Sequence, residues 1–514
     1  MLVYSNLLKE FKNYFGSELN HRPIQGFKQA YYINKSRVRD IAFFFSEKMF
    51  YLKNILINDL PQSYEIIYEY FSKMLQEDKN IFIFTHVDKA SNEIDSVRVA
   101  YPHIGNYEDE VTKRYGLKFL YFKEEMEESL YLDTSTLYPS HSDNNLLSLG
   151  IFNKIHLNNN YFHLKIEKDI IKSVDLKTGW LYRGIIPLLK HKKWSYENLK
   201  LIEKISFNNS FHHNLAYSLA LESILNINTS ARVKLLRTVY CELERISNHM
   251  VWFSNLMYLL KYYKDYYSLL SRHLYLLKIL EKELGSVYFE NLNYIGYVKD
   301  IPWYSIEDLK NKVEVVVLST FGILYKKIYS SYFKNRCKKL GVISHDNAIE
   351  SGIVGPNLRA SGIAHDVRQF TPYNSYSDNA VIGSWEVVSF TDGDIFSRAQ
   401  ARLWEIKNSN SIIQRCLEIV LKDESDITPI DLSKKKLNAN EYGISVVEAP
   451  QGELVYVVKT GDRPGKDELG SVYIQTPSFN NFFALKNYLI PNSDIRDFPL
   501  IVHSMDLCFN CIDL

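Results

Sequence analysis

The sequence has few cysteines and no long apolar run, and each shortage excludes a class of protein. Its 514 residues include five cysteines, too few for the disulfide framework of a secreted scaffold. No window reaches the roughly 18 consecutive apolar residues that a membrane-spanning helix needs. The N-terminal residues acquire charge too early for a signal peptide. We therefore expect a soluble chain in a reducing compartment, which meets a membrane only through partners.

An excess of either charge is also missing. Lys and Arg number 61, Asp and Glu number 60, and the formal net charge is +1. Proteins that grip nucleic acid usually carry a clear basic excess, so we expect no nucleic-acid partner. The hydrophobic fraction of 46% and the charged fraction of 24% are those of a globular protein. The length predicts two or more domains.

The first part of the chain predicts a small α/β unit. Apolar, β-branched and aromatic residues make 80–87 a strand, and 96–101 alternates like its partner. Residues 107–115 are expected to form a short helix that Gly116 ends. The stretch 133–145 is rich in Ser, Thr, Asp, Asn and Pro, which indicates a linker or long loop.

The remainder predicts a helical core followed by strands. Strands are expected near 149–157 and 161–166, and helices from about 194 to 329. The clearest helix begins after Ser230, a residue type that caps helix N-termini. A second long helix is expected over 394–421, and strands and turns return after about 440. The first helix has an apolar stripe and an opposite polar face: Leu235, Val239, Leu243, Ile246, Met250, Phe253 and Met257 against Arg237, Glu244, Arg245 and Asn248.

Five segments place polar residues or glycines where a plain core has no use for them. Cys508 and Cys511 form a C-x-x-C pair, which can share one soft metal or form a disulfide. Cys241 lies on the long helix and is expected to be a small packed side chain. His212 and His213 are adjacent and diverge on a helix, which favours packing or capping over metal binding. The five segments are Gly179–Gly184, Ser206–Tyr217, Gly355–Gly362, Glu448–Glu453 and Ser504–Cys511.

Taken together, these segments resemble the large subunit of nickel–iron hydrogenases. They resemble most closely the membrane-associated, energy-converting kind found in formate hydrogenlyase, and also the related quinone-reducing subunit of respiratory complex I. The stretch 108–117 resembles the small complex I subunit that docks on the large one. The main resemblance runs from about Pro139 to Leu514 and rests on Arg183-Gly184, Ser210-Phe211, His213, Leu215-Ala216-Tyr217, Glu242-Leu243-Glu244-Arg245, His249, Gly355-Pro356, Arg359, Ser361-Gly362, Asp394, Arg398, Arg402, Glu448-Ala449-Pro450, Gly452, Pro477-Ser478-Phe479, Asp506-Leu507-Cys508 and Cys511.

The resemblance implies an α+β fold of two fused domains. Residues 1–135 would form the small α/β domain, similar to the small partner subunit of complex I. Residues 136–514 would form the large domain with a helical core, similar to the hydrogenase large subunit and the complex I quinone-site subunit.

The departures from the hydrogenase pattern fall at positions that bind or serve the metal centre in hydrogenases. Active hydrogenases hold nickel and iron with two C-x-x-C pairs, and the first pair here is replaced by Ser206 and Asn209. A hydroxyl and an amide are poor substitutes for soft thiolates. Ile186 replaces the glutamate that serves proton transfer in hydrogenases, Leu507 replaces a proline, and the sequence ends three residues after Cys511. We predict that no nickel–iron centre assembles and that hydrogen evolution is disfavoured.

The complex I subunit has lost its cysteines and binds a quinone head group in the emptied cavity. By resemblance, Tyr217 and His141 would contact the quinone carbonyls, and a phenol and an imidazole can supply protons as it is reduced. Tyr217 as a satisfied core residue and His141 as an ordinary loop residue are the alternatives. The cavity would also be framed by Ser206, Asn209, His213, Arg359, Ser361 and Asp506. For Cys508 and Cys511 three alternatives stay open: the pair is an idle remnant, it binds another metal, or it is a redox dithiol.

The resemblance also implies the partners. A small iron–sulfur subunit would deliver electrons from its nearest cluster, membrane subunits would hold the chain at the inner face of the cell membrane, and a quinone or another small acceptor would receive the electrons. Two alternatives stay open: a hydrogenase large subunit with an unusual metal site, and a non-catalytic structural or coupling subunit.

Overall fold

The fold is α+β, as the sequence predicts. The computed structural model describes residues 2–514 except 17–18, 22–28, 49, 73–79, 102–103, 121–145, 150–160, 180, 192–193, 195, 287, 384, 424, 426 and 462–468. The predicted domain boundary at 135–136, the predicted linker over 133–145 and His141 lie outside the described residues.

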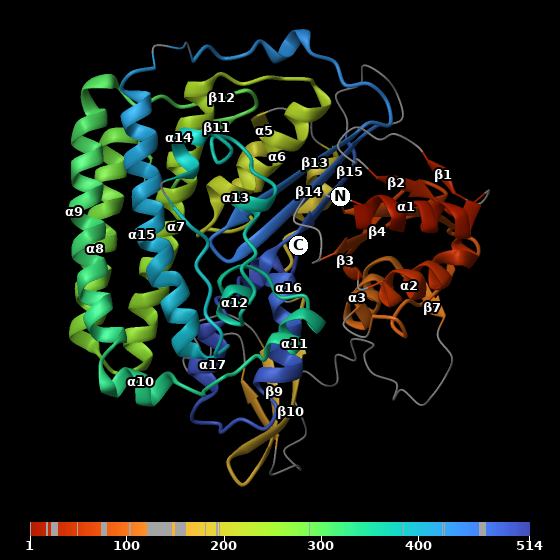
Figure 1. The fold of residues 1–514 in the computed structure, drawn as a ribbon, viewed down its shortest axis with the longest axis horizontal. Helices are drawn as coiled ribbons and strands as arrows, with labels where there is room; N and C mark the ends of the chain where they lie inside the picture. The colour runs from red at the N-terminus through yellow and green to blue at the C-terminus, as the bar shows by residue number, and fades with distance from the viewer. Residues whose placement is uncertain are drawn as a thin grey trace.

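The N-terminal 120 residues contain a five-stranded sheet, drawn in red and orange in Figure 1. Its order is β1 (Asn20–His21), β2 (Ala30–Tyr32), β5 (Ile81–Asp88), β4 (Ser63–Ser72) and β3 (Phe50–Asp59). The helices of this unit are α1 (Leu2–Phe15), α2 (Val38–Glu47) and α3 (Gly105–Tyr115). Strand β5 and helix α3 confirm the predictions for 80–87 and 107–115. Helix α3 ends at Gly116, whose φ of 70° suits glycine.

The strand predicted over 96–101 is wrong. Strand β6 ends earlier (Glu93–Asp95) and pairs in parallel with β7 (Lys118–Leu120), while the following residues form a loop and turns. The buried carboxylate of Glu108 accepts hydrogen bonds from Ser96 Oγ at 2.6 Å and from the Val97 N–H at 2.8 Å. The chain therefore turns onto a side chain here instead of pairing with a neighbouring strand.

Four long helices form the bundle at one side of the molecule (Figure 1). They are α7 (Ala231–Leu259), α8 (Tyr263–Leu284), α9 (Trp303–Ile328) and α15 (Ile395–Val420), and α15 packs on both α7 and α9. Ser230 and Asp394 cap α7 and α15 by accepting backbone N–H groups. The two long helices predicted from the sequence are confirmed.

The polar face of α7 is buried as well as its apolar stripe. Arg237, Glu244, Arg245 and Asn248 are each at most 3% exposed. Arg237, for example, donates two hydrogen bonds to the Glu222 carboxylate on α6 (Ser210–Ile224). Helix α7 is therefore surrounded by protein, and its polar face carries internal ion pairs.

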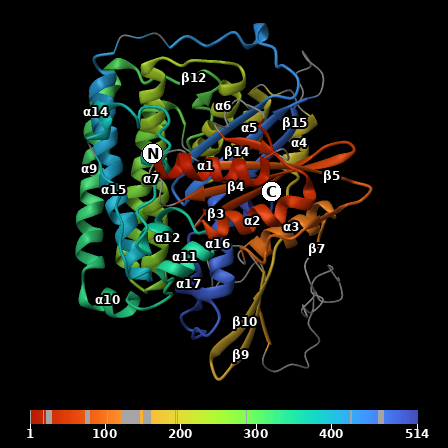
Figure 2. The ribbon, with the colours of Figure 1, turned by 45° about the vertical axis from the view of Figure 1, so that its right-hand side comes forward.

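A second sheet lies between the bundle and the N-terminal unit (Figure 1), and in Figure 2 the N-terminal unit is in front of this sheet. Strands β13 (Tyr442–Ala449), β14 (Gly452–Thr460) and β15 (Leu469–Gln475) pair antiparallel, α6 packs on β13 and β14, and β15 contacts β3. The strands expected after residue 440 are confirmed. One apolar cluster joins the two units: Ala30, Leu56, Ile67 and Phe84 with Tyr442, Val455 and Val457.

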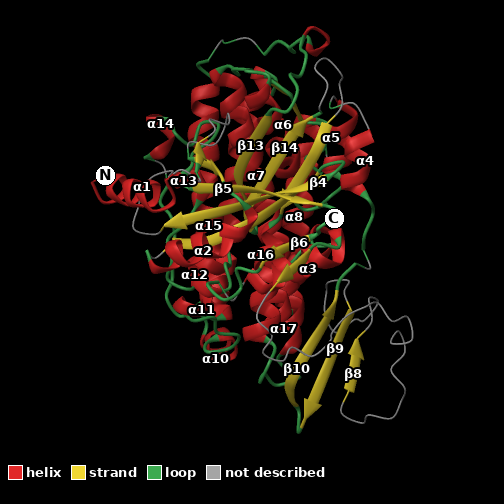
Figure 3. Cartoon of the chain, turned by 90° about the vertical axis from the view of Figure 1, so that its right-hand side faces the viewer, coloured by secondary structure: helices red, strands yellow, loops and turns green. Residues whose placement is uncertain are grey.

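A third sheet projects from one end of the molecule (Figure 3). It consists of β8 (Leu146–Leu149), β9 (Tyr161–Glu167) and β10 (Ile170–Lys177). The strand predicted over 161–166 is confirmed, and of the one predicted over 149–157 only Leu149 and none of 150–157 is among the described residues. Smaller elements complete the fold: β11 (Asn293–Tyr294), β12 (Tyr297–Val298), α4 (Ile185–His191), α5 (Tyr196–Glu203), α10 (Ser331–Cys337), α11 (His345–Glu350), α12 (Gly355–Ala360), α13 (Val367–Phe370), α14 (Asn379–Ile382), α16 (Pro477–Ala484) and α17 (Phe498–Ser504).

Among the described helices, none combines the length and the apolar character that crossing a membrane requires.

Candidate functional site

The start of α6 and the C-terminal turn meet in the structure. Ser206 and Asn209 lie in the turn before α6. Cys508 directly precedes a short 3₁₀ turn near the end of the chain, and Cys511 is the last residue of that turn. The Sγ of Cys508 lies 3.6 Å from the Oγ of Ser206. Cys508 and Cys511 are joined by a disulfide. The two segments that hold the metal in hydrogenases are thus neighbours here, with one pair of sulfurs between them.

Hydrogen bonds hold the C-terminal segment in place. The Cys508 N–H donates to Ser478 Oγ at 2.8 Å, and Thr476 Oγ1 donates to the Cys511 carbonyl at 2.9 Å. The Asp513 carboxylate accepts the N–H groups of Gly179 at 2.7 Å and Leu181 at 2.9 Å. The cysteine pair is therefore positioned by three separate parts of the chain.

Two further polar groups reach the turn before α6 and the cysteine segment. Gln451, at the tip of the β13–β14 hairpin, accepts a hydrogen bond from the Asn209 amide. Asp506 lies 3.7 Å from a guanidinium nitrogen of Arg402, which stacks 4.5 Å above the Trp252 ring. Burial raises the pKa of Asp506, and Arg402 only partly opposes it. No described residue donates a hydrogen bond to the buried Asn209 Oδ1, and the Oδ2 of Asp506 has only the longer ion pair with Arg402, so both oxygens can accept a hydrogen bond from a ligand.

The neighbouring histidines are held by the protein. The Nδ1 of His212 lies 2.5 Å from a Glu244 oxygen, and the Nδ1 of His213 lies 2.7 Å from the Tyr456 hydroxyl. Burial lowers the pKa of His213 to about 3, so it is neutral at physiological pH. In the part of the chain that the structure describes, no three His, Cys, Asp or Glu side chains are grouped to hold a metal ion.

Tyr217 is fully buried on α6, and its hydroxyl has partners. It donates to the Trp194 carbonyl at 3.1 Å and accepts from the Asn198 amide at 3.2 Å. Burial raises its pKa above the ordinary value for tyrosine. These contacts match the alternative of a satisfied core residue, and its quinone role stays a prediction.

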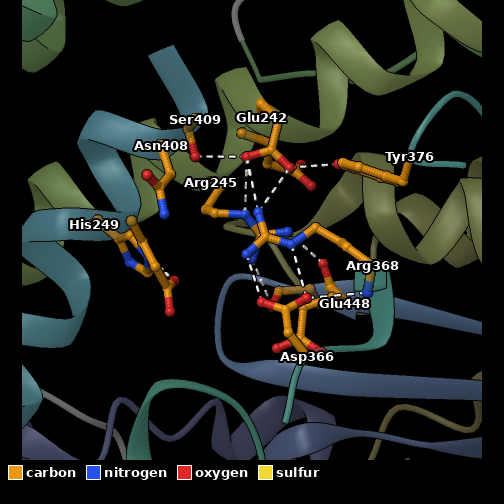
Figure 4. Close-up of polar contacts among 12 residues, drawn as sticks. Glu242, Arg245, His249, Asp366, Arg368, Tyr376, Asn408, Ser409 and Glu448 are labelled. Atoms are coloured by element: carbon orange, nitrogen blue, oxygen red, sulfur yellow. Dashed lines mark hydrogen bonds and ion pairs between the residues drawn. The ribbon is translucent and has the colours of Figure 1, made fainter. Parts of the chain in front are cut away.

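Arg359 lies in a buried charge cluster. Figure 4 shows Glu242, Arg245, Asp366, Arg368 and Glu448 of this cluster. It contacts Glu405 Oε1 through two nitrogens at 3.0 and 2.7 Å, and Glu448 Oε1 at 2.8 Å. Ser361 donates to the Asn357 carbonyl at 3.2 Å. The buried charge cluster is defined by seven side chains, each at most 2% exposed: Glu242, Arg245, Arg359, Asp366, Arg368, Glu405 and Glu448.

The carboxylates of this cluster have very different environments. Burial alone would raise the pKa of Glu242, but Arg245 and Arg368 outweigh it and hold that pKa at about 2. In the same way Arg359 overcomes the burial of Glu405 and keeps its pKa well below the usual range. The pKa of Glu448 is instead raised, first by burial and then by Asp366. Glu448 is the exception among these side chains.

The sequence did not single out Gln451, Glu448 or Arg402 as site residues, although all three lie in the segments or positions that carry the resemblance. Gln451 lies between Pro450 and Gly452, in the turn that joins β13 to β14. Its contact with Asn209 joins residues 242 positions apart, which no local pattern reveals.

The cavity next to the site is small. It measures about 120 Å³ and lies beside the turn before α6 and against α7, lined in part by Phe207, Asn208, Glu244, Asn248 and His273. Pockets for drug-sized ligands usually measure roughly 300–1,000 Å³. Its lining does not include Tyr217, Asp506 or Cys508.

Comparisons with known proteins support the family resemblance. Residues 275–514 match the family model described as "Respiratory-chain NADH dehydrogenase, 49 Kd subunit". The carbon monoxide-induced hydrogenase of Rhodospirillum rubrum is 29% identical over 362 residues, which cover 69% of this chain and 94% of that protein. A subunit of the NADH-quinone oxidoreductase of Thermosipho melanesiensis is 28% identical over 364 residues, which cover 68% of this chain and 94% of that protein.

A solved structure shares the fold. A chain of the membrane-bound sulfane sulfur reductase, an archaeal respiratory membrane complex, aligns with a TM-score of 0.65 over 73% of this chain and 100% of that chain, at 23% identity. The comparisons thus show similarity to hydrogenase and complex I subunits and a shared fold, while the closer likeness to formate hydrogenlyase stays a prediction.

Proposed function

We propose that this chain is the large subunit of a membrane-associated oxidoreductase complex, and that it passes electrons from a small iron–sulfur subunit to a small acceptor without a nickel–iron centre. Membrane subunits of the complex would hold it at the inner face of the cell membrane. The observation that carries the proposal is the contact of Ser206 with Cys508, which is bonded to Cys511. By resemblance this is where hydrogenases hold their metal, and one of the two cysteine pairs is present, as a disulfide.

The donor set does not fit nickel and iron. Soft thiolates select such metals, and here two sulfurs are bonded to each other while the opposite positions supply a hydroxyl and an amide. The Asn209 amide nitrogen is engaged by Gln451. The proposed reaction therefore involves no metal bound to this chain.

The same place suits a small acceptor that carries hydrogen-bond donors when reduced. Among the described residues none donates a hydrogen bond to the buried Asn209 Oδ1, and Asp506 Oδ2 has only the 3.7 Å contact with Arg402, so a group that donates to them would satisfy two buried acceptors. A quinone at Tyr217 would have to replace the contacts of its hydroxyl with Trp194 and Asn198. An acceptor beside Cys508 would leave those contacts intact.

Reoxidation of the purified complex tests the proposal. The clusters of the reduced complex are followed optically after a short-chain quinone or inorganic polysulfide is added. We expect one of the two to reoxidise the clusters, and we expect Cys508→Ser to slow that step at least tenfold. Tyr217→Phe separates the two places: a matching loss with the quinone assigns the acceptor to Tyr217, and no loss assigns it to the cysteine pair. Failure of both acceptors to reoxidise the clusters would contradict the proposal and favour a structural subunit.

A further inference from the structure

The buried charge cluster contains one more carboxylate than guanidinium. Glu242, Asp366, Glu405 and Glu448 face Arg245, Arg359 and Arg368. Two pairs at its edges, Arg402 with Asp506 and Lys53 with Glu453, each contain one basic and one acidic side chain. Fully ionised, the cluster would keep one uncompensated buried negative charge, which costs several kcal/mol and is usually removed by binding a proton.

Three of the four carboxylates are strongly held as anions. Glu242 receives Arg368 at 3.1 Å and Arg245 at 3.2 Å, and the hydroxyls of Ser409 and Tyr376 also donate to it (Figure 4). Asp366 receives two nitrogens of Arg368 at 2.9 and 2.6 Å.

Glu405 receives two nitrogens of Arg359 and lies 2.9 Å from His249 Nε2. A carboxylate with two guanidinium contacts favours its charged form.

Glu448 has the weakest support for a negative charge. One nitrogen of Arg359 reaches it at 2.8 Å, and that nitrogen also donates to the His365 carbonyl at 2.9 Å. The other oxygen of Glu448 accepts the Val367 N–H at 3.1 Å. The nearby anion of Asp366 opposes a second negative charge. The extra proton is therefore best placed on Glu448.

His249 is a poorer place for the proton. Its Nε2 contacts Glu405, but no described residue forms a hydrogen bond with its buried Nδ1. A protonated ring would leave that N–H unsatisfied in the interior, which is costly. Burial also lowers the pKa of His249 to about 4, so the ring is neutral at physiological pH.

We propose that the Glu448 carboxyl holds the one exchangeable proton of the buried charge cluster and donates it when the acceptor beside Cys508 is reduced. The donor step rests on the proposed function. In that step a two-electron acceptor takes two electrons from the iron–sulfur subunit and two protons, one from Glu448 and one from solvent, and the Glu448 carboxylate is then reprotonated from solvent. Glu448 lies three residues before Gln451 on the hairpin that reaches Asn209.

Charged groups on several elements surround Glu448, and together they determine the pKa of its carboxyl. Burial and Asp366 raise its pKa, whereas Arg359, Arg245 and Arg368 lower it. Tyr373 contributes a hydroxyl that accepts the Glu448 N–H at 3.2 Å. Lys53 of β3 also senses the Glu448 charge.

Infrared spectroscopy of the purified resting complex tests the holding of the proton. The difference between wild type and Glu448→Gln at neutral pH should contain the C=O band of one protonated carboxyl. Asp366→Asn removes the neighbouring anion and the charge excess, so Glu448 should ionise and the same band should disappear. Glu108 is an internal reference, since burial raises its pKa to about 7 and its band should survive both changes. No band difference in Glu448→Gln would overturn the proposal.

The donor step is tested on the reduced complex in H₂O and D₂O. Because general acids typically contribute about 100-fold or more, we expect Glu448→Gln to lower the acceptor-reduction rate by about that factor, with little change in KM and with loss of the wild-type solvent isotope effect. A rate within twofold of wild type would overturn the donor role. If wild type itself reduces no acceptor, the proposed function fails, while the resting-state band still decides whether Glu448 holds the proton.

Discussion

Arg359 joins three acidic side chains that come from different parts of the chain. Its guanidinium contacts Glu405 on α15, Glu448 on β13 and, at 3.4 Å, Asp366 before α13. Its side chain is 1% exposed, so water cannot replace those contacts. A single residue of the Gly355–Gly362 segment thereby connects the helix bundle with the central sheet.

We predict that Arg359→Met costs about 3–5 kcal/mol of unfolding free energy, because removing one partner leaves buried carboxylates uncompensated. Chemical denaturation measures this cost. Arg336→Met is the matched control: Arg336 pairs with Asp497 at 2.6 Å, but the two side chains are 34% and 26% exposed. The control should cost no more than about 1 kcal/mol. Equal losses in the two variants would contradict the importance of the cluster.

At the scale of elements, a close approach of backbones sets the position of α12. Gly355, at the first residue of the helix, has a φ of 70°, and a Cβ there would lie 2.2 Å from the Gln451 carbonyl oxygen. The β13–β14 hairpin and α12 therefore fit together only with glycine at this position.

We predict that Gly355→Ala destabilises the protein by more than about 2 kcal/mol, since it combines a positive φ with a backbone clash. Gly322→Ala in α9 is the control, because a Cβ there meets no atom within 4 Å. Alanine should be neutral or stabilise by up to about 1 kcal/mol in that helix interior. Thermal unfolding compares the two, and a smaller loss for Gly355→Ala than this would contradict the tight packing.

The long helices and the strands were predictable because their apolar residues repeat locally. Helix α7 shows the limit: its stripe and its Ser230 cap follow from the sequence, but the burial of Arg237 and Glu244 does not. Ion pairs such as Arg237 with Glu222 depend on which helices meet. The strand predicted over 96–101 is wrong for the same kind of reason, since Glu108 binds that segment from a later helix.

The sequence also predicted part of the candidate site, but not the contacts between distant residues. The resemblance placed Ser206 and Asn209 opposite Cys508 and Cys511, and the structure brings Ser206 and Cys508 together. It did not reveal Gln451 as the partner of Asn209, nor the charge excess around Glu448. Both depend on distances between residues far apart in the sequence.

At the scale of the whole molecule, buried neutral histidines make stability depend on pH. Burial lowers the pKa of His213 to about 3, and of His249 and His503 to about 4. In an unfolded chain histidine has a pKa of about 6.5. Above pH 6.5 both states are neutral. Below pH 6.5 the histidines of the unfolded chain bind protons, whereas the buried histidines of the folded chain stay neutral. The free energy of unfolding therefore falls from about pH 6.5 toward pH 4.

We predict that each such histidine costs about 1.4 kcal/mol per pH unit over that interval. Denaturant titrations at pH 7 and pH 5 measure the slope. In His503→Phe the loss between these two values should be smaller by about 2 kcal/mol. An unchanged slope would mean that His503 is protonated in the folded state.

The absence of a nickel–iron centre is the central claim about the whole assembly, and metal content tests it most directly. Nickel, iron and zinc are counted per copy of this chain in the natively purified complex. The account predicts iron at the level that the clusters of the small subunit explain, with no nickel. Stoichiometric nickel would contradict it and would assign hydrogenase chemistry to a site with Ser206 and Asn209 in place of two thiolates.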